Sequence, residues 1–136
     1  MITFCEKIPS CEEFNCLTDS VGWGRDDRIV VETALKNTIF AVCAYDGEKI
    51  VGFGRLIGDG AMFLYVQDVM VLPEYQSQKI GTEIMNRIVN VISDYKAFNP
   101  YLRAYLGASK GKEKFYEKFG FVTRMDADLG EGMVFI

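Results

Sequence analysis

The sequence predicts an α/β fold in which a mixed, mostly antiparallel twisted sheet of about seven strands carries about four helices. Asp46-Gly47 and Asp59-Gly60 lie between apolar runs, where such pairs mark hairpin turns. Apolar side chains then recur at helical spacing over residues 80–95, between two predicted strands. A strand–helix–strand crossover after an antiparallel meander gives a mixed sheet with helices on its faces. The length of 136 residues, 49% of them apolar, predicts a single domain over 1–136 with its own core.

The N-terminal part is predicted to hold one strand, two helices and two further strands. Ser10 is placed to cap the first helix, with Glu13 in capping-box position, and Asp26 or Asp27 caps the second. The second helix is expected to bury the face formed by Ile29, Val30, Thr33 and Ala34. The five elements are expected over residues 2–8, 10–20, 27–36, 39–45 and 49–57.

The C-terminal part is predicted to alternate strands and helices and to end in two strands. The first strand here is apolar on both faces, so we expect it in the centre of the sheet. Gly120 is placed as the glycine that ends the last helix. The complete order is β-α-α-β-β-β-α-β-α-β-β. The elements of this part are expected over residues 62–72, 80–95, 101–106, 111–119, 121–124 and 133–136.

The chain contains no histidine, which narrows the chemistry that it can perform. Ser-His-Asp and Cys-His catalysis and histidine-ligated metals are excluded. The four cysteines form no Cys-x-x-Cys pair, so we expect no metal site. Any general base must therefore be a carboxylate, a tyrosine, a lysine or an ordered water.

The formal net charge of −4 indicates what kind of partner the protein meets. Nucleic-acid binding needs a basic face and is not expected, whereas a cationic amine is an easier electrostatic match. The N-terminus lacks the basic run and the long apolar core of a signal peptide, so none is expected, and no apolar run is long enough to span a membrane. Together with the unpaired cysteines, these features predict a protein of the reducing cytoplasm.

The stretch from Val69 to Gly81 carries the strongest functional signal. An apolar strand ends at Pro73, a polar loop follows, and Gly81 opens the long helix, so free backbone N–H groups converge as an anion site. The loop resembles the Arg/Gln-x-x-Gly-x-Gly/Ala signature with which the GNAT superfamily of N-acetyltransferases holds the pyrophosphate of acetyl-CoA. Gln76 matches the first position and Gly81 the last, while Lys79 replaces the middle glycine.

A second motif extends the resemblance to nearly the whole chain. The run from Phe115 to Phe121 resembles the late Phe-Tyr-x-x-x-Gly-Phe motif of that superfamily, and the predicted element order is also the GNAT order. The run from Asp68 to Gln76 and the ending Gly130–Met133 are similar to plastid arylalkylamine (serotonin-type) acetyltransferases. The resemblance implies acetyl-CoA as co-substrate, bound by Val69, Met70, Val71, Gln76, Ser77, Gln78, Lys79, Ile80, Gly81 and Thr82.

Tyr116 is the residue that the resemblance assigns to the thiolate of CoA. A neutral phenol there can protonate the departing sulfur or hold it by a hydrogen bond. The alternative is that Tyr116 shares a core face with Phe115 and Phe119, because their spacing fits a buried helix side equally well.

Asp68, Gln67 and Trp23 are the candidates for the acceptor side. An unpaired carboxylate in an apolar run costs several kcal/mol, so Asp68 needs a partner. That partner is either the backbone at a bulge, or a substrate ammonium whose proton Asp68 relays. Gln67, next to it, is predicted to bind the acceptor. Trp23, between two glycines, either walls the acceptor pocket or covers the core.

The function that these features predict is transfer of acetyl from acetyl-CoA to a primary amine of a small molecule, by direct attack in a ternary complex. Two alternatives stay open: acetylation of a protein lysine or N-terminus, and a CoA-binding sensor without chemistry. The resemblance also implies a homodimer. No metal, nucleic acid or membrane is expected as a partner.

Overall fold

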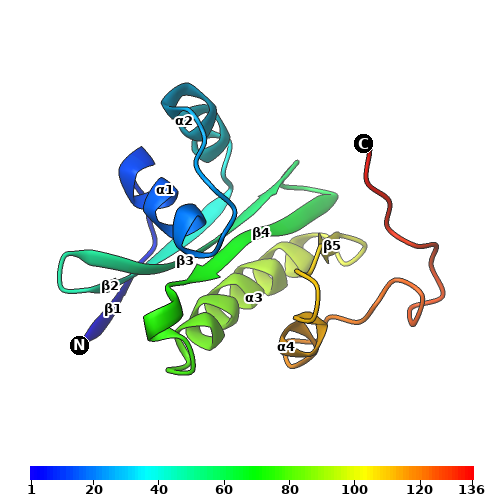
Figure 1. Cartoon of the computed structure of the whole chain (residues 1–136). Coiled ribbons are helices and arrows are strands. Elements are labelled where there is room, and N and C mark those ends of the chain that lie inside the picture. Colours follow the sequence, from blue (N-terminus) through cyan, green and yellow to red (C-terminus); the bar gives the residue numbers. More distant parts are fainter.

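The computed structural model describes residues 1–136 and contains one five-stranded sheet in the order β1-β2-β3-β4-β5. All neighbouring strands are antiparallel except β4 and β5, which are parallel. Figure 1 shows α1 and α2 on one side of the sheet and α3 on the other. The elements are β1 (Ile2–Cys5), α1 (Cys11–Ser20), α2 (Arg28–Lys36), β2 (Phe40–Asp46), β3 (Lys49–Gly58), β4 (Phe63–Val71), the 3-10 turn η1 (Pro73–Tyr75), α3 (Ile80–Phe98), β5 (Arg103–Leu106) and α4 (Glu113–Glu117).

The mixed, mostly antiparallel sheet and the four α-helices are as predicted, but the sheet has five strands and not seven. The two strands predicted over residues 121–124 and 133–136 are wrong, because both stretches are irregular. A strand exists only where another strand pairs with it, and nothing pairs with the outer edge of β5. β4 lies inside the sheet as expected, although β3 is the middle strand.

The two N-terminal helices differ in how well local sequence predicts them. The capping box of α1 is confirmed: Ser10 Oγ accepts from the Glu13 N–H at 3.1 Å, and the Glu13 carboxylate accepts from the Ser10 N–H at 2.9 Å. The face predicted for α2 is wrong, because Ile29 and Val30 are exposed and Val31 and Leu35 are buried. A nine-residue helix with apolar residues on several sides can present any of them, and only its neighbours decide which.

Helix α3 packs directly on the backbone of β3. The apolar side chains predicted to form its inner face are buried, among them Ile80, Ile84 and Ile88. A Cβ atom at Gly54 of β3 would lie 2.7 Å from Ile84 Cγ2 and 3.0 Å from Ile88 Cδ1, and Gly52 is nearly as close to the same helix. These two glycines let α3 approach the sheet, which fixes the start of α3 beside the end of β4.

None of the helices is both long and apolar enough to cross a membrane.

A β-bulge interrupts β4 at Asp68, whose φ is +57°. Phe53 pairs with Met70 but Arg55 pairs with Gln67, so β4 contains one more residue than β3 over this stretch. On the other edge, β5 pairs with β4 only from residue 63 to residue 66. Beyond that point the two parallel strands separate, and the opening between them holds the candidate site.

Candidate active site

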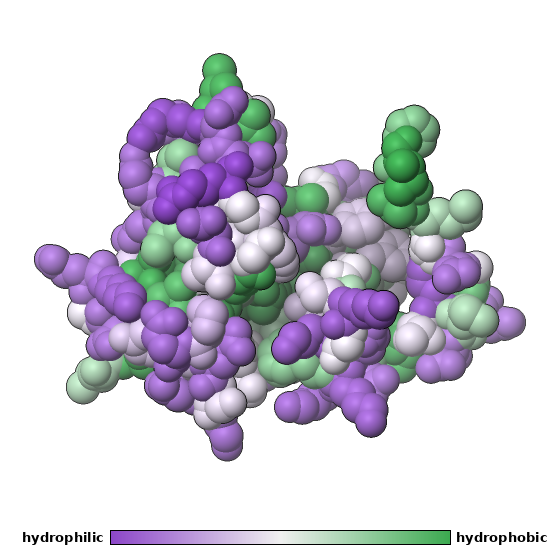
Figure 2. Space-filling model, viewed as in Figure 1, coloured by the Kyte–Doolittle hydropathy of each residue, from purple (hydrophilic) through white to green (hydrophobic).

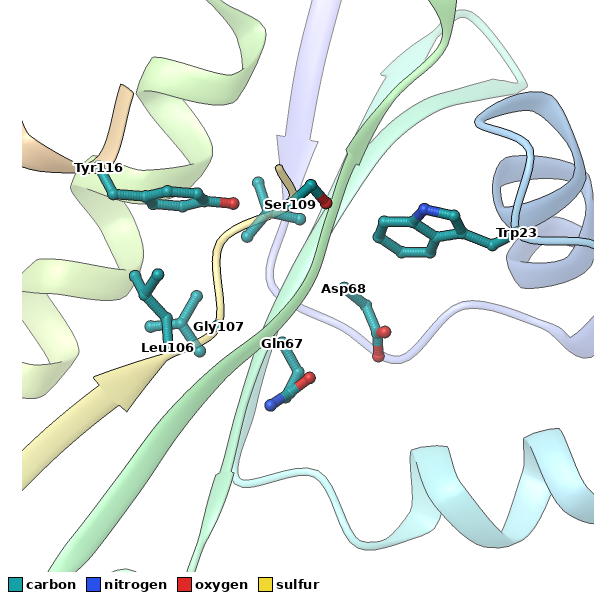
Figure 3. A pocket seen from close by; sticks show the side chains of 9 residues that line it. Trp23, Gln67, Asp68, Leu106, Gly107, Ser109 and Tyr116 are labelled. Atoms are coloured by element: carbon teal, nitrogen blue, oxygen red, sulfur yellow. The ribbon is translucent and has the colours of Figure 1, made fainter. Parts of the chain in front are cut away.

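A cavity of about 220 Å³ occupies the opening where β4 and β5 separate. Figure 3 shows Tyr116 of α4 and Trp23 of the loop after α1 facing each other from opposite sides of this cavity. The structure thus brings together four residues from three separate stretches that the sequence singled out for catalysis or acceptor binding. The lining residues are Trp23, Val66, Gln67, Asp68, Val69, Leu106, Gly107, Ser109 and Tyr116.

Tyr116 packs with its ring and presents its hydroxyl to the cavity. The ring makes an edge contact with Phe115, at 5.0 Å between centroids, and rests against the hydrophobic core. The hydroxyl points into the cavity (Figure 3). Burial raises the pKa of the phenol, so Tyr116 is protonated at neutral pH. The core-packing and proton-donor interpretations of the sequence are therefore compatible in one side chain.

A larger groove of about 740 Å³ leads from the start of α3 to the same tyrosine. Both cavity and groove are lined by Trp23, Val69, Ser109 and Tyr116, so the two spaces meet at these residues. Of the ten residues predicted to bind acetyl-CoA, only Gln78 does not line the groove. The nine that do are Val69, Met70, Val71, Gln76, Ser77, Lys79, Ile80, Gly81 and Thr82.

The loop before α3 has the backbone geometry of an anion site. Ser77 and Lys79 adopt left-handed conformations, with φ of +66° and +63°. No backbone N–H from Ser77 to Thr82 donates a hydrogen bond within the protein, and the 19-residue helix adds its dipole. Gln76 Nε2 donates to the Val71 carbonyl at 3.1 Å, which closes the loop. The free N–H groups fit the pyrophosphate that the sequence resemblance implies.

Lys79→Gly is expected to stabilise the fold by up to about 1 kcal/mol, because a left-handed backbone strains lysine but not glycine. Affinity for CoA should be kept or increased, since the backbone donors stay in place. Thermal unfolding and calorimetric titration with CoA check the two effects, with Lys118→Gln, at another lysine of the groove, as a control for charge. A clear loss of affinity beyond that of the control would show that the Lys79 ammonium is itself a phosphate ligand.

Asp68 has a partner that sequence reasoning did not identify. Arg55 of β3 donates from Nε to Asp68 Oδ2 at 2.7 Å, and both side chains are largely buried, at 11% and 21% exposure. The same guanidinium donates from Nη1 to the Ala34 carbonyl at 2.9 Å and to Thr38 Oγ1 at 3.1 Å. Arg55 therefore ties the bulge to the end of α2. The available signal in the sequence was an arginine inside the apolar part of one predicted strand and an aspartate inside the apolar part of the next.

The acceptor-side candidates differ in what surrounds them. Trp23 exposes 51% of its surface, so the interpretation of Trp23 as a core cover is wrong. Gln67 lines the cavity and also a third space beside β5. Ser109, in the loop after β5, lines both the cavity and the groove and was not among the sequence candidates. Its only sequence signal was its position between a predicted strand and a predicted helix.

Comparison with known proteins, by sequence and by fold, points to the family that the sequence motifs resemble. Residues 36–123 match the family model of the acetyltransferase (GNAT) domain. The Arabidopsis thaliana protein named GCN5-related N-acetyltransferase 1, chloroplastic, is 33% identical over 131 residues, which cover 92% of this chain and 61% of that protein. The chain spans about three fifths of the length of the curated relatives it matches.

Two solved structures extend this similarity over complete chains. A protein of unknown function from methicillin-resistant Staphylococcus aureus, described as a probable acetyltransferase, superposes with a TM-score of 0.86 at 31% identity, covering 100% of both chains. A GNAT-family acetyltransferase from Streptococcus pneumoniae gives 0.83 at 30% identity, covering 100% of this chain and 98% of that one. The chain therefore belongs to the GNAT superfamily of N-acetyltransferases.

Proposed function

We propose that the protein transfers the acetyl group of acetyl-CoA to a primary amine of a small molecule, by direct attack in a ternary complex. The observation that carries this proposal is the position of the Tyr116 hydroxyl. It lies where the groove from the α3 N-terminus meets the cavity lined by Trp23, Gln67 and Asp68. A thioester reaching along the groove and an amine in the cavity would meet beside this phenol.

The residues of the groove and of the cavity suggest how acetyl-CoA and the acceptor amine would each be handled. The backbone donors before α3 hold the pyrophosphate, and the groove orients the thioester toward Tyr116. As the amine forms its bond to the carbonyl carbon, the carbon–sulfur bond breaks, and Tyr116 donates its proton to the sulfur. Asp68, whose Oδ2 is paired with Arg55, lies on the cavity wall where the proton lost by the amine can pass to it or to water.

The small-molecule acceptor is supported by the size of the cavity and by the net charge of the protein. A cavity of about 220 Å³ has room for a small amine, and a net charge of −4 attracts a cationic one. The cytoplasmic location and the homodimer remain predictions from the sequence.

A panel of acceptors incubated with acetyl-CoA, with release of free thiol as the readout, tests the proposal. Polyamines, arylalkylamines and amino sugars are compared with lysine-containing and free N-terminal peptides. We expect turnover with at least one small amine and lower kcat/KM with every peptide. Preference for a peptide would identify a protein acetyltransferase. Calorimetric binding of CoA without turnover on any acceptor would identify a CoA sensor. Absence of CoA binding would reject both the acetyltransferase and the sensor.

A further inference from the structure

Arg55 is a positive charge in a strand whose other central residues are buried and apolar, among them Val51, Phe53 and Leu56. Only 11% of its side chain is exposed. Removing a cation from water costs free energy unless other groups satisfy it. The partners of its guanidinium therefore show what an arginine at this place in the fold can do.

The guanidinium of Arg55 joins the end of α2 to the bulge in β4. Nη1 donates to the Ala34 carbonyl at 2.9 Å and to Thr38 Oγ1 at 3.1 Å, while Nε donates to Asp68 Oδ2 at 2.7 Å. The donors of a guanidinium lie in one plane at fixed directions, so holding Nη1 also sets the direction in which Nε points. The position of the Asp68 carboxylate thus depends on the end of α2.

The end of α2 is itself fixed to the protein core. Val31 and Leu35 on its inner side are 2% and 3% exposed. The Thr38 N–H donates to the Leu35 carbonyl at 3.1 Å, and the Ile39 N–H donates to the Leu56 carbonyl of β3 at 2.8 Å. These bonds hold the Thr38 hydroxyl at one place relative to β3, and therefore relative to Arg55.

Asp68 has one carboxylate oxygen engaged and one free. Its backbone φ of +57° is a left-handed conformation that few residues other than glycine adopt. Oδ2 is bound to Arg55, whereas Oδ1 accepts no hydrogen bond within the protein and is not sealed from solvent. Figure 3 shows the Asp68 side chain between those of Gln67 and Trp23, and Figure 2 shows the surface hollowed between the α1 side and the α4 side, where this cavity lies. Oδ1 is therefore available to a ligand in the cavity.

We propose that Arg55 and Thr38 are positioning residues for deprotonation of the acceptor: they hold Asp68 Oδ2, so that Oδ1 faces the acceptor ammonium. This inference rests on the proposed acetyl transfer. In the step concerned, an N–H bond of the ammonium breaks and an O–H bond forms at Oδ1, directly or through one water. The freed electron pair of nitrogen attacks the thioester carbonyl, and Asp68 returns the proton to water. Neither Arg55 nor Thr38 lines the cavity, so Thr38 acts through Arg55, and Arg55 through Asp68.

Thr38→Val tests the outermost member of this chain of contacts, because it keeps the shape of the side chain and removes the hydroxyl. We expect kcat/KM for the acceptor to fall by about two- to tenfold, the effect of one hydrogen bond, with affinity for acetyl-CoA unchanged. The loss should be largest at low pH, where most of the acceptor is protonated, and should shrink as pH rises. A merely structural disturbance would lower the rate equally at every pH. Thr38→Ser, which keeps the hydroxyl, should retain wild-type kinetics.

Thr33→Val is the matched control in the same helix. The Thr33 hydroxyl donates to the Ile29 carbonyl of its own helix at 2.6 Å and is exposed, so its removal should leave the pH–rate profile unchanged. All variants are compared at a temperature where circular dichroism shows that they are folded.

A double-mutant cycle asks whether Thr38 acts through Arg55. Arg55→Lys keeps the positive charge but replaces the planar fork with a single ammonium, so it should lower kcat/KM by at least as much as Thr38→Val. Adding Thr38→Val to Arg55→Lys should then cause no further loss.

Four results overturn the proposal: wild-type kinetics in a folded Thr38→Val, a loss that does not vary with pH, a loss of the same size in Thr33→Val, or additive losses in the cycle. In each of these the wild type still turns over, so the proposed acetyl transfer stands. A wild type without turnover on any acceptor instead rejects the proposed transfer, and this inference with it.

Discussion

Replacing Tyr116 with phenylalanine is expected to lower acetyl-transfer turnover by about ten- to a thousandfold, the range of a lost general acid or single charge-stabilising donor. The ring packs against Phe115 and the core, so the variant keeps its packing and its fold. Because the phenol serves the sulfur only as it leaves, kcat should fall while affinity for acetyl-CoA is nearly unchanged. Burial raises the pKa of Tyr116, so the phenol is protonated throughout neutral pH and the loss should not vary there.

Steady-state kinetics on the best acceptor of the panel, with calorimetric binding of acetyl-CoA, measures both quantities. Tyr101→Phe is the matched control, because this tyrosine is 88% exposed and does not line the cavity. Wild-type turnover in Tyr116→Phe would contradict the proton-donor role and leave the side chain as one of the aromatic core residues of α4.

Asp68→Asn is expected to reduce both stability and turnover, and the two effects separate the two interpretations of this residue. Losing one charge of a largely buried pair costs about 1–3 kcal/mol here, less than for a fully buried pair, because both partners keep some contact with water. Turnover should fall most at low pH, where the acceptor amine is mostly protonated and its deprotonation is most demanding.

Arg55→Gln supplies the comparison, because it breaks the same ion pair and leaves the carboxylate in place. Chemical denaturation gives the stability of each variant, and pH–rate profiles are measured at a temperature where both are folded. A larger loss of turnover in Asp68→Asn than in Arg55→Gln supports proton transfer by Asp68. Equal losses, or unchanged turnover with lower stability, would make the carboxylate structural and assign the base to water or another group.

The parts of the fold that depend on neighbours in sequence were predictable. The Asp-Gly turns, the capping box at Ser10 and the inner face of α3 depend on residues a few positions apart, and the structure has them. The face of α2 and the last two strands depend on what lies across the molecule. Val31 is buried rather than Val30 because of tertiary contacts, and residues 133–136 cannot form a strand without a partner strand.

The residues of the candidate site also differ in whether local sequence or tertiary structure determines their role. The strand-to-helix loop at Gln76–Gly81 was readable because an anion site at a helix start is a local property. The choice of Tyr116 came from the resemblance to a family, since its spacing fitted core packing equally well. Arg55 was missed because the pairing of charges on two neighbouring strands depends on strand register, which the bulge at Asp68 shifts by one residue.

The direct packing of α3 on Gly52 and Gly54 bears on how the sequence of the loop before α3 can change during evolution. The helix start is held by contacts with β3, so its N–H groups stay at the end of β4 whatever residues the loop contains. Lys79 can then replace a signature glycine while the anion site survives. A bulky side chain at Gly54, far from any ligand, would instead displace the whole helix. Among divergent relatives, small residues at these two strand positions should therefore track retained CoA binding better than the loop glycine does.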